Sequence, residues 1–359
     1  MDNVKHPGFY INKFLVEHNW SQKELSVRTK TSEKHISNLL SEKNSISAAM
    51  ARKLQYATGI SATEWLNYQI EFDTAEINRI EKNNISKAEL EILSNPYVKP
   101  ILEYMEGLQY VTSTTNSEKI IELRGLIGVS DLTSITDLQS KTAYRKQKVH
   151  LDVYALHMWE VLCDKTIGET ESSPLNLQLL NKKLKDIKNI MFSSVCDIER
   201  QLKTILSQCG VTFALIKNFT GVPVQGFIKQ GKNNNINLCM TLRQKRADIF
   251  WFTLFHEIGH ILLKHTEKPF LDFKDSIGKN EEEADTFASD FLFEAEAYSS
   301  FIKKGLFDYC HIEQLAKKLQ IQPWMIIGRL QHEQCIPFYS PLNQMIEKYS
   351  WIDVEEQNM

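Results

Sequence analysis

The chain has 359 residues, of which 42% are hydrophobic and 24% are charged, and its formal net charge is −3. The length predicts two or three domains, and the small negative charge excludes a general attraction to nucleic acid, so DNA binding would need a local patch. No apolar run is long enough to span a bilayer, and the N-terminus has no hydrophobic signal region. The six scattered cysteines predict reduced thiols in a cytoplasmic protein and exclude a CxxC zinc site.

Short helices are predicted from residue 9 to residue 72. Ser21 and Ser32 each stand at the N-cap of a helix, and Glu24 completes a capping box with Ser21. The connection at residues 29–31 is tight. Two short capped helices joined in this way predict a helix-turn-helix, whose second helix would lie in the major groove of DNA.

Residues 6–73 resemble the XRE-type helix-turn-helix domain of HigA-like antitoxins, in the opening HPG at 6–8, the Ser21–Gln22 pair and the closing Trp65 and Gln69. The family's usual small-residue turn with Gly is replaced by Thr-Lys-Thr at 29–31. The resemblance implies that a double-stranded DNA operator is contacted by Gln22, Ser32, Glu33, Lys34, Ser37 and Asn38.

The charge of this N-terminal segment is modest for a DNA-binding domain. Residues 1–70 contain nine Lys and Arg against six Asp and Glu, a net charge of +3. A homodimer would double the phosphate contacts. The alternative is a helical module that binds protein and reads no DNA.

The next segment has helical spacing and no chemical motif, and we interpret it as a helical linker or interaction region. The predicted division is 1–75 for the helix-turn-helix domain, 76–205 for the helical region, 206–345 for a third domain and 346–359 for an acidic tail.

Strands are predicted at 211–216, 226–229 and 236–240, followed by the apolar stretch FWFTLFHEIGHILL at 250–263. This stretch contains an HExxH motif, formed by His256, Glu257 and His260. On a helix the two imidazoles lie one turn apart on the same face and can share a zinc ion. Glu257 would then be placed to take a proton from a water molecule beside the metal.

A second helix is predicted from the sequence NEEEAD at 280–285. Glu281 and Asp285 would share one face, so Glu281 could be the third zinc ligand and Asp285 could hold the outer nitrogen of His256. The alternatives are Glu282 or Glu283 as ligand, or a solvated acidic helix start. His265 does not fit a third-histidine pattern and is predicted at the surface or behind a ligand.

Residues 209–292 resemble the ImmA/IrrE family of metallopeptidases, through the Cys-Gly at 209–210, HEIGHILLKH at 256–265 and EEEADTFASDFL at 281–292. The resemblance implies a zincin-like α+β peptidase domain, with His256, His260 and Glu281 as Zn²⁺ ligands and Glu257 as catalytic base; Mn²⁺ could replace zinc in vitro. Phe293 and Glu294 depart from the family's closing Leu-Met-Pro. The segment 311–330 has helix-turn-helix-like spacing, and a segment of this kind ordinarily ends such domains. The alternative is that it forms a second DNA-binding motif.

The sequence therefore predicts a mainly α protein in which a five-helix DNA-binding domain and a small α+β peptidase domain flank a helical region. Its expected substrate is a repressor-like protein or the chain itself, cleaved in a stress, mobile-element or toxin–antitoxin response. The alternative is a non-enzymatic, antitoxin-like autorepressor that binds a cognate toxin, with a sensory or structural metal site. Candidates for the donor to the oxyanion, chosen by residue type alone, are Tyr298, His311 and His332.

Overall fold

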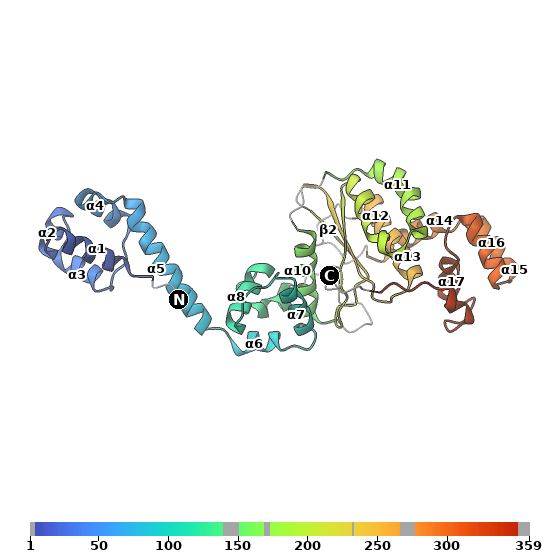
Figure 1. Ribbon diagram of the computed structural model, residues 1–359, viewed down its shortest axis with the longest axis horizontal. Helices are drawn as coiled ribbons and strands as arrows, with labels where there is room; N and C mark the ends of the chain where they lie inside the picture. The colour runs from blue at the N-terminus through green and yellow to red at the C-terminus, as the bar shows by residue number, and fades with distance from the viewer. Residues whose placement is uncertain (1–3, 139–150, 169–172, 232, 266–276, 351–359) are drawn as a thin grey trace. The chain divides into compact units, whose positions relative to one another are not determined.

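The computed structural model describes residues 4–138, 151–168, 173–231, 233–265 and 277–350 (Figure 1). The chain divides into two compact units, Met1–Lys87 and Ala88–Met359. The protein is mainly helical with one small mixed sheet, as the sequence predicts. Among the described residues, every helix is too short or too polar to cross a bilayer. The acidic end of the chain beyond residue 350 lies outside the described residues.

The first unit is built from helices, and a serine stands at the N-cap of each one after the first, whose N-cap is His6. These helices are α1 (Pro7–Glu17), α2 (Gln22–Arg28), α3 (Glu33–Leu40), α4 (Ala48–Thr58) and α5 (Ala62–Asn83). Ser21, Ser32, Ser47 and Ser61 each accept a hydrogen bond from the backbone N–H three residues later, at the starts of α2 to α5. Each cap satisfies one of the free donors of a helix start and fixes where the helix begins.

One apolar core holds these helices together. It contains Ile11, Leu15, Leu25, Ile36, Leu39, Ile46, Met50, Ala51, Leu54 and Trp65. The side-chain oxygen of buried Gln69 on α5 accepts the backbone N–H of Ile46, before α4. α5 continues to Asn83, past the predicted domain boundary at 75.

The second unit begins with a lobe of short helices: α6 (Lys87–Leu93), α7 (Lys99–Gly107), α8 (Asn116–Ile127), the 3-10 turn η1 (Leu132–Ser134) and α9 (Ile135–Leu138). A buried ion pair ties three of them together. The guanidinium of Arg124 on α8 donates to both carboxylate oxygens of Glu89 on α6, at 2.9 and 2.7 Å. Glu89 also accepts the N–H of Leu132 and is fully buried. Every oxygen of this buried carboxylate is therefore paired.

Helix α10 (Val153–Ile167) joins this lobe to the sheet, so the helical region predicted as a linker packs against the strands. Its buried Trp159 donates from Nε1 to the carbonyl oxygen of Lys217 and lies edge-on to Phe227 of strand β2. The neighbouring Ile228 belongs to the core formed with the later helices. Because side chains alternate along a strand, Phe227 and Ile228 mark the two faces of the sheet.

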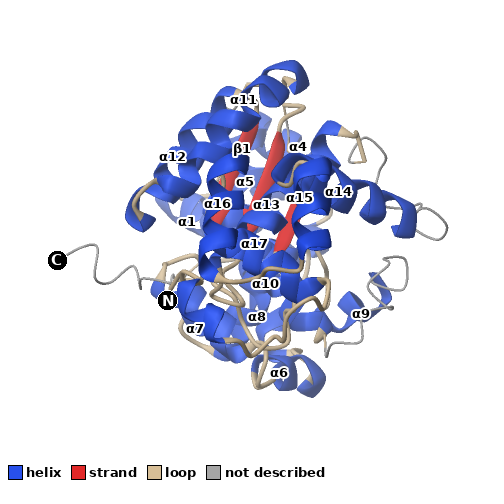
Figure 2. Ribbon diagram, turned by 90° about the vertical axis from the view of Figure 1, so that its right-hand side faces the viewer, coloured by secondary structure: helices blue, strands red, loops and turns tan. Residues whose placement is uncertain are grey.

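The sheet consists of β1 (Val211–Leu215), β2 (Gly226–Gln230) and β3 (Ile236–Met240), in the order β1-β3-β2. β1 runs parallel to β3, and β2 runs antiparallel to it. Figure 2 shows the three strands enclosed by helices of the second unit. All three strands were predicted, and β2 forms one edge of the sheet.

The remaining helices of this unit are α11 (Leu177–Asn189), η4 (Ile190–Phe192), α12 (Val195–Gln208), α13 (Ala247–Leu262), α14 (Ile277–Leu292), α15 (Ala295–Lys304), α16 (Tyr309–Leu319), α17 (Pro323–His332) and η5 (Pro341–Met345). α13 is buried along most of its length. Buried Tyr349 packs near the N-terminal end of α13, where its hydroxyl accepts a hydrogen bond from Nε1 of Trp251 at 2.9 Å. Residues 346–349, predicted in the acidic tail, thus include side chains that pack against the helix carrying HExxH.

Candidate metal centre

Two helices, α13 and α14, supply the polar groups of the site, and a glycine lets them lie close together. Gly259, within the HExxH motif, is fully buried, and a Cβ atom placed on it would lie 2.9 Å from the ring of Phe287 and 3.4 Å from the backbone of Ala284. A side chain there would push α14 away. Gly259 and Ala284 therefore set the separation of the two helices at the level of the site.

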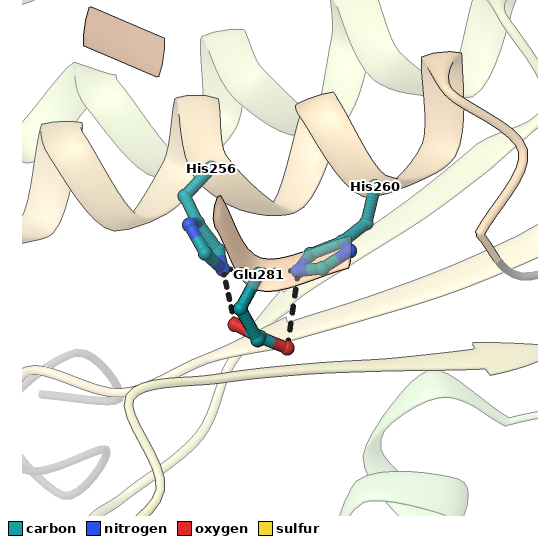
Figure 3. A group of neighbouring side chains, drawn as sticks. All are labelled: His256, His260 and Glu281. Atoms are coloured by element: carbon teal, nitrogen blue, oxygen red, sulfur yellow. Dashed lines mark hydrogen bonds and ion pairs between the residues drawn. The ribbon is translucent and has the colours of Figure 1, made fainter. Parts of the chain in front are cut away.

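The sequence-predicted ligands meet at one point (Figure 3). Nε2 of His256 and Nε2 of His260 are 3.0 Å apart, and the carboxylate of Glu281 lies across from both, with Oε2 3.1 Å from the first and Oε1 3.5 Å from the second. One ligand atom from each of the three residues lies within 4.8 Å of the others. The i, i+4 spacing on α13 places the imidazoles side by side, and α14 brings in the carboxylate.

The geometry fits a metal ion with mixed nitrogen and oxygen ligands. Ligands 2.0–2.1 Å from a tetrahedral zinc ion lie about 3.4 Å from one another, close to the separations of 3.0 to 3.5 Å found here. Three protein ligands also leave a fourth position open, as catalytic rather than structural zinc sites do. These three residues could hold a metal ion; zinc remains the prediction from the residue types.

The outer nitrogen of His256 contacts Asp285, the residue for which this contact was predicted. Nδ1 of His256 lies 2.7 Å from Oδ1 of Asp285, one turn after Glu281 on α14. A carboxylate at Nδ1 keeps a proton on that nitrogen, so Nε2 is the nitrogen that can offer its lone pair to a cation. The helical register of α14 therefore favours Glu281 as ligand over Glu282 and Glu283.

The charges around His256 strongly favour its protonated form when no cation is bound. Burial alone would lower its pKa, but the hydrogen bond to Glu281 and the charge of Glu257 outweigh burial and raise the pKa to about 9. Hydrogen bonds from His256 and His260 lower the pKa of Glu281 to about 2. The site thus attracts positive charge to the place where the three ligand atoms converge.

Glu257 stands beside the ligand group without joining it. It is half-buried, and desolvation raises the pKa of its carboxyl, against the lowering effect of the two histidines. A Cβ atom placed on Gly226, the first residue of β2, would overlap Oε1 of Glu257. The backbone of this edge strand therefore approaches the carboxylate closely. Sequence reasoning missed this contact because it joins positions 31 residues apart.

Two of the three candidate oxyanion donors have partners elsewhere. The hydroxyl of Tyr298 donates to Glu333 at 2.9 Å, and Nδ1 of His311 lies 2.7 Å from Asp308. For His332 the structure gives no contact with the ligand group. Geometry supplies no reason to assign any of the three to the site.

The predicted DNA contacts lie at the start of α2 and along α3. Gln22, Ser32, Glu33, Lys34 and Ser37 are exposed, and Asn38 is half-buried. Ser32 already caps α3 with its hydroxyl. Nearby Arg28 is exposed, pairs with Glu24 at 2.8 Å and lies 3.9 Å above the ring of Trp20. The role of these residues in DNA binding stays a prediction.

Residues 238–330, about a quarter of the chain, match the family model described as the IrrE N-terminal-like domain, Peptidase_M78. The match runs from β3 through the HExxH helix and α14 to α17, so it includes the C-terminal helix pair at 311–330. It supports a metallopeptidase-like domain in this part of the chain. No curated protein matches the chain.

Proposed function

We propose that this chain is a DNA-binding transcriptional regulator whose C-terminal domain is a zinc-dependent endopeptidase that cleaves a regulatory protein. The observation that carries the peptidase part is the convergence of His256, His260 and Glu281, with Glu257 held next to them. The family match over residues 238–330 supports the same reading.

His256, His260 and Glu281 would hold the zinc ion, which when bound would supply Lewis acidity toward a scissile carbonyl and a water molecule. Glu257 accepts a proton from that water and returns it to the leaving amine. Desolvation raises the pKa of its carboxyl, which makes the carboxylate a stronger base for the first step. Asp285 fixes the tautomer of His256.

We propose that the substrate chain binds beside Glu257. In the described part of the sheet β2 pairs with β3 only, and its first residue, Gly226, lies against the carboxylate. An extended peptide could add to this free edge by backbone hydrogen bonds. The substrate that we propose, a repressor-like protein or the chain itself, follows from the resemblance to ImmA/IrrE peptidases.

Intact-mass spectrometry tests the proposal. The purified protein is incubated with Zn²⁺ or Mn²⁺, alone and with the repressor-like proteins encoded beside its gene, next to the Glu257→Gln variant. Removing the base should slow cleavage by about 10²- to 10⁴-fold, while the three ligands stay in place and zinc is still bound. Fragments that appear equally with Glu257→Gln would come from another protease and contradict the assignment.

The N-terminal unit supplies the DNA-binding part of the proposal. Exposed residues of α3 next to the capped start of the helix suit a recognition helix, and a homodimer would place two such helices on successive half-sites. Lys34→Ala should weaken binding to the operator upstream of the gene about equally for all sequences and reduce the salt slope by about 1. Glu42→Ala, an exposed position after α3, is the control and should change neither.

The competing function is an antitoxin-like autorepressor that binds a toxin and cleaves nothing. It predicts that wild type and Glu257→Gln repress equally and that no fragment forms with any partner. Operator binding without cleavage would favour this function and leave the metal a sensory or structural role.

A further inference from the structure

His265 is the last described residue before 277, and it folds back onto the end of the HExxH helix. α13 ends at Leu262, and the chain then reverses through Lys264, whose φ of 63° lies in the left-handed region. The backbone N–H of His265 donates to the carbonyl oxygen of His260 at 3.0 Å. This turn returns the His265 ring to the helix, where its side chain is only 10% exposed.

The returned ring meets the nitrogen of His260 that faces away from Glu281. Nδ1 of His260 and Nδ1 of His265 are 2.9 Å apart, and Nε2 of His265 lies 3.2 Å from Oε2 of Glu283 on α14. Oε1 of Glu283 in turn lies 3.5 Å from Nζ of Lys279. A line of polar contacts therefore runs from His260 to α14.

Chemistry fixes the direction of these hydrogen bonds when His260 offers the lone pair of Nε2 to a cation. Its proton must then be on Nδ1, which donates to the lone pair of His265 Nδ1. His265 is left with its proton on Nε2, which donates to the Glu283 carboxylate. Each donor thus has one acceptor, and the line ends on a charged group that accepts strongly.

We propose that His265 and Glu283 are positioning residues that orient His260 toward the metal, as Asp285 orients His256. The proposal deepens the proposed function and rests on its metal centre. The two ligand histidines are then oriented in different ways. The carboxylate of Asp285 contacts His256 directly, whereas the carboxylate of Glu283 acts on His260 through the imidazole of His265.

The position of His265 depends on the left-handed turn at Lys264 and on burial of its ring, features that a surface histidine does not need. A non-glycine residue adopts a positive φ only at an energetic cost. Here that conformation is what brings the ring back within reach of His260. The turn and the buried ring therefore both serve to place His265 against His260.

Zinc affinity of the metal-free full chain, measured by competition with a chromophoric chelator, tests the proposal without any substrate. Loss of a partner behind a ligand typically weakens metal binding 10- to 100-fold, and we expect this range for His265→Ala. Glu283→Ala should lose less, because the imidazole of His265 remains. Glu282→Ala removes the same charge one residue along α14 and should bind within about twofold of wild type.

A conservative variant separates positioning from folding. In His265→Asn the amide oxygen can take the place of Nδ1 as acceptor, so zinc affinity should recover most of the loss seen with His265→Ala. Circular dichroism compares the helix content of all variants. If wild type binds zinc and His265→Ala binds equally well, the positioning role is wrong and the metal centre stands. If wild type itself does not bind zinc, the proposed function and this inference both fail.

Discussion

Zinc binding should depend steeply on pH, because the metal has to displace a proton from His256. In the metal-free chain the pKa of His256 is raised from 6.5 to about 9, despite burial, by the hydrogen bond to Glu281 and the charge of Glu257. A histidine with a pKa of about 9 is mostly protonated at neutral pH. A histidine that binds a cation must be neutral, so binding releases this proton and apparent affinity rises with pH up to about 9.

The size of the effect separates a shifted histidine from an ordinary one. With a pKa of about 9, apparent affinity should increase about ninefold between pH 7 and pH 8, since the neutral fraction rises by that factor. With the unshifted value of 6.5 the increase would be only about 1.3-fold. Competition with a chelator of known proton linkage measures the affinity, and calorimetry in buffers of different ionisation enthalpy counts the released protons.

The cause of the shift can be tested in the same assay. Glu281→Gln removes the group that raises this pKa most, so binding should weaken and its pH dependence should become shallower. Glu282→Gln removes an equal charge one residue along and should keep the wild-type slope. A wild-type increase below twofold between pH 7 and pH 8, or equal slopes in wild type and Glu281→Gln, would refute the account of the site's electrostatics.

Two further variants test packing that the site and the fold depend on. Gly226→Ala should displace the Glu257 carboxylate and slow cleavage by at least about tenfold, with zinc affinity unchanged; full activity would show that the close approach of β2 is not needed. Arg124→Ala leaves the carboxylate of Glu89 buried without its charged partner and should lower the free energy of unfolding by about 3–5 kcal/mol. In denaturant titrations Lys99→Ala, which breaks an exposed pair, is the control and should cost less than about 1 kcal/mol.

Local patterns in the sequence predicted the parts of the fold that local physics decides. Ser21 and Ser32 cap helices where their spacing to the following residues indicated, and the three strands lie where runs of β-formers are bounded by turn residues. The connection at 29–31 has no glycine, although the HigA-like domains that the N-terminal segment resembles usually have one in this turn. Lys30 adopts a φ of 49° there, so a lysine takes the left-handed conformation that a glycine would adopt more readily.

Contacts between residues far apart in the chain could not be predicted from the sequence. The HExxH spacing predicts that His256 and His260 share a face, but the position of Glu281 opposite them depends on how closely Gly259 lets α14 approach. Likewise, helical periodicity predicted α10 but not its place on the sheet, which depends on Trp159 and its contact with Phe227. His265 illustrates the limit best, since its partner His260 is reached only through an unusual backbone turn.

The placement of Glu257 is the strongest argument for turnover over a purely sensory or structural metal. A structural site closes its coordination with protein ligands and has no use for an additional carboxylate next to an open position. Here a half-buried carboxylate with a raised pKa is kept beside three ligands, and the adjoining strand has a glycine where any side chain would overlap it. Desolvating that carboxylate costs stability, and neither a toxin-binding surface nor a scaffold would recover this cost. A base that must exchange protons with water and with a leaving amine does require it, which favours proteolysis as the work of this domain.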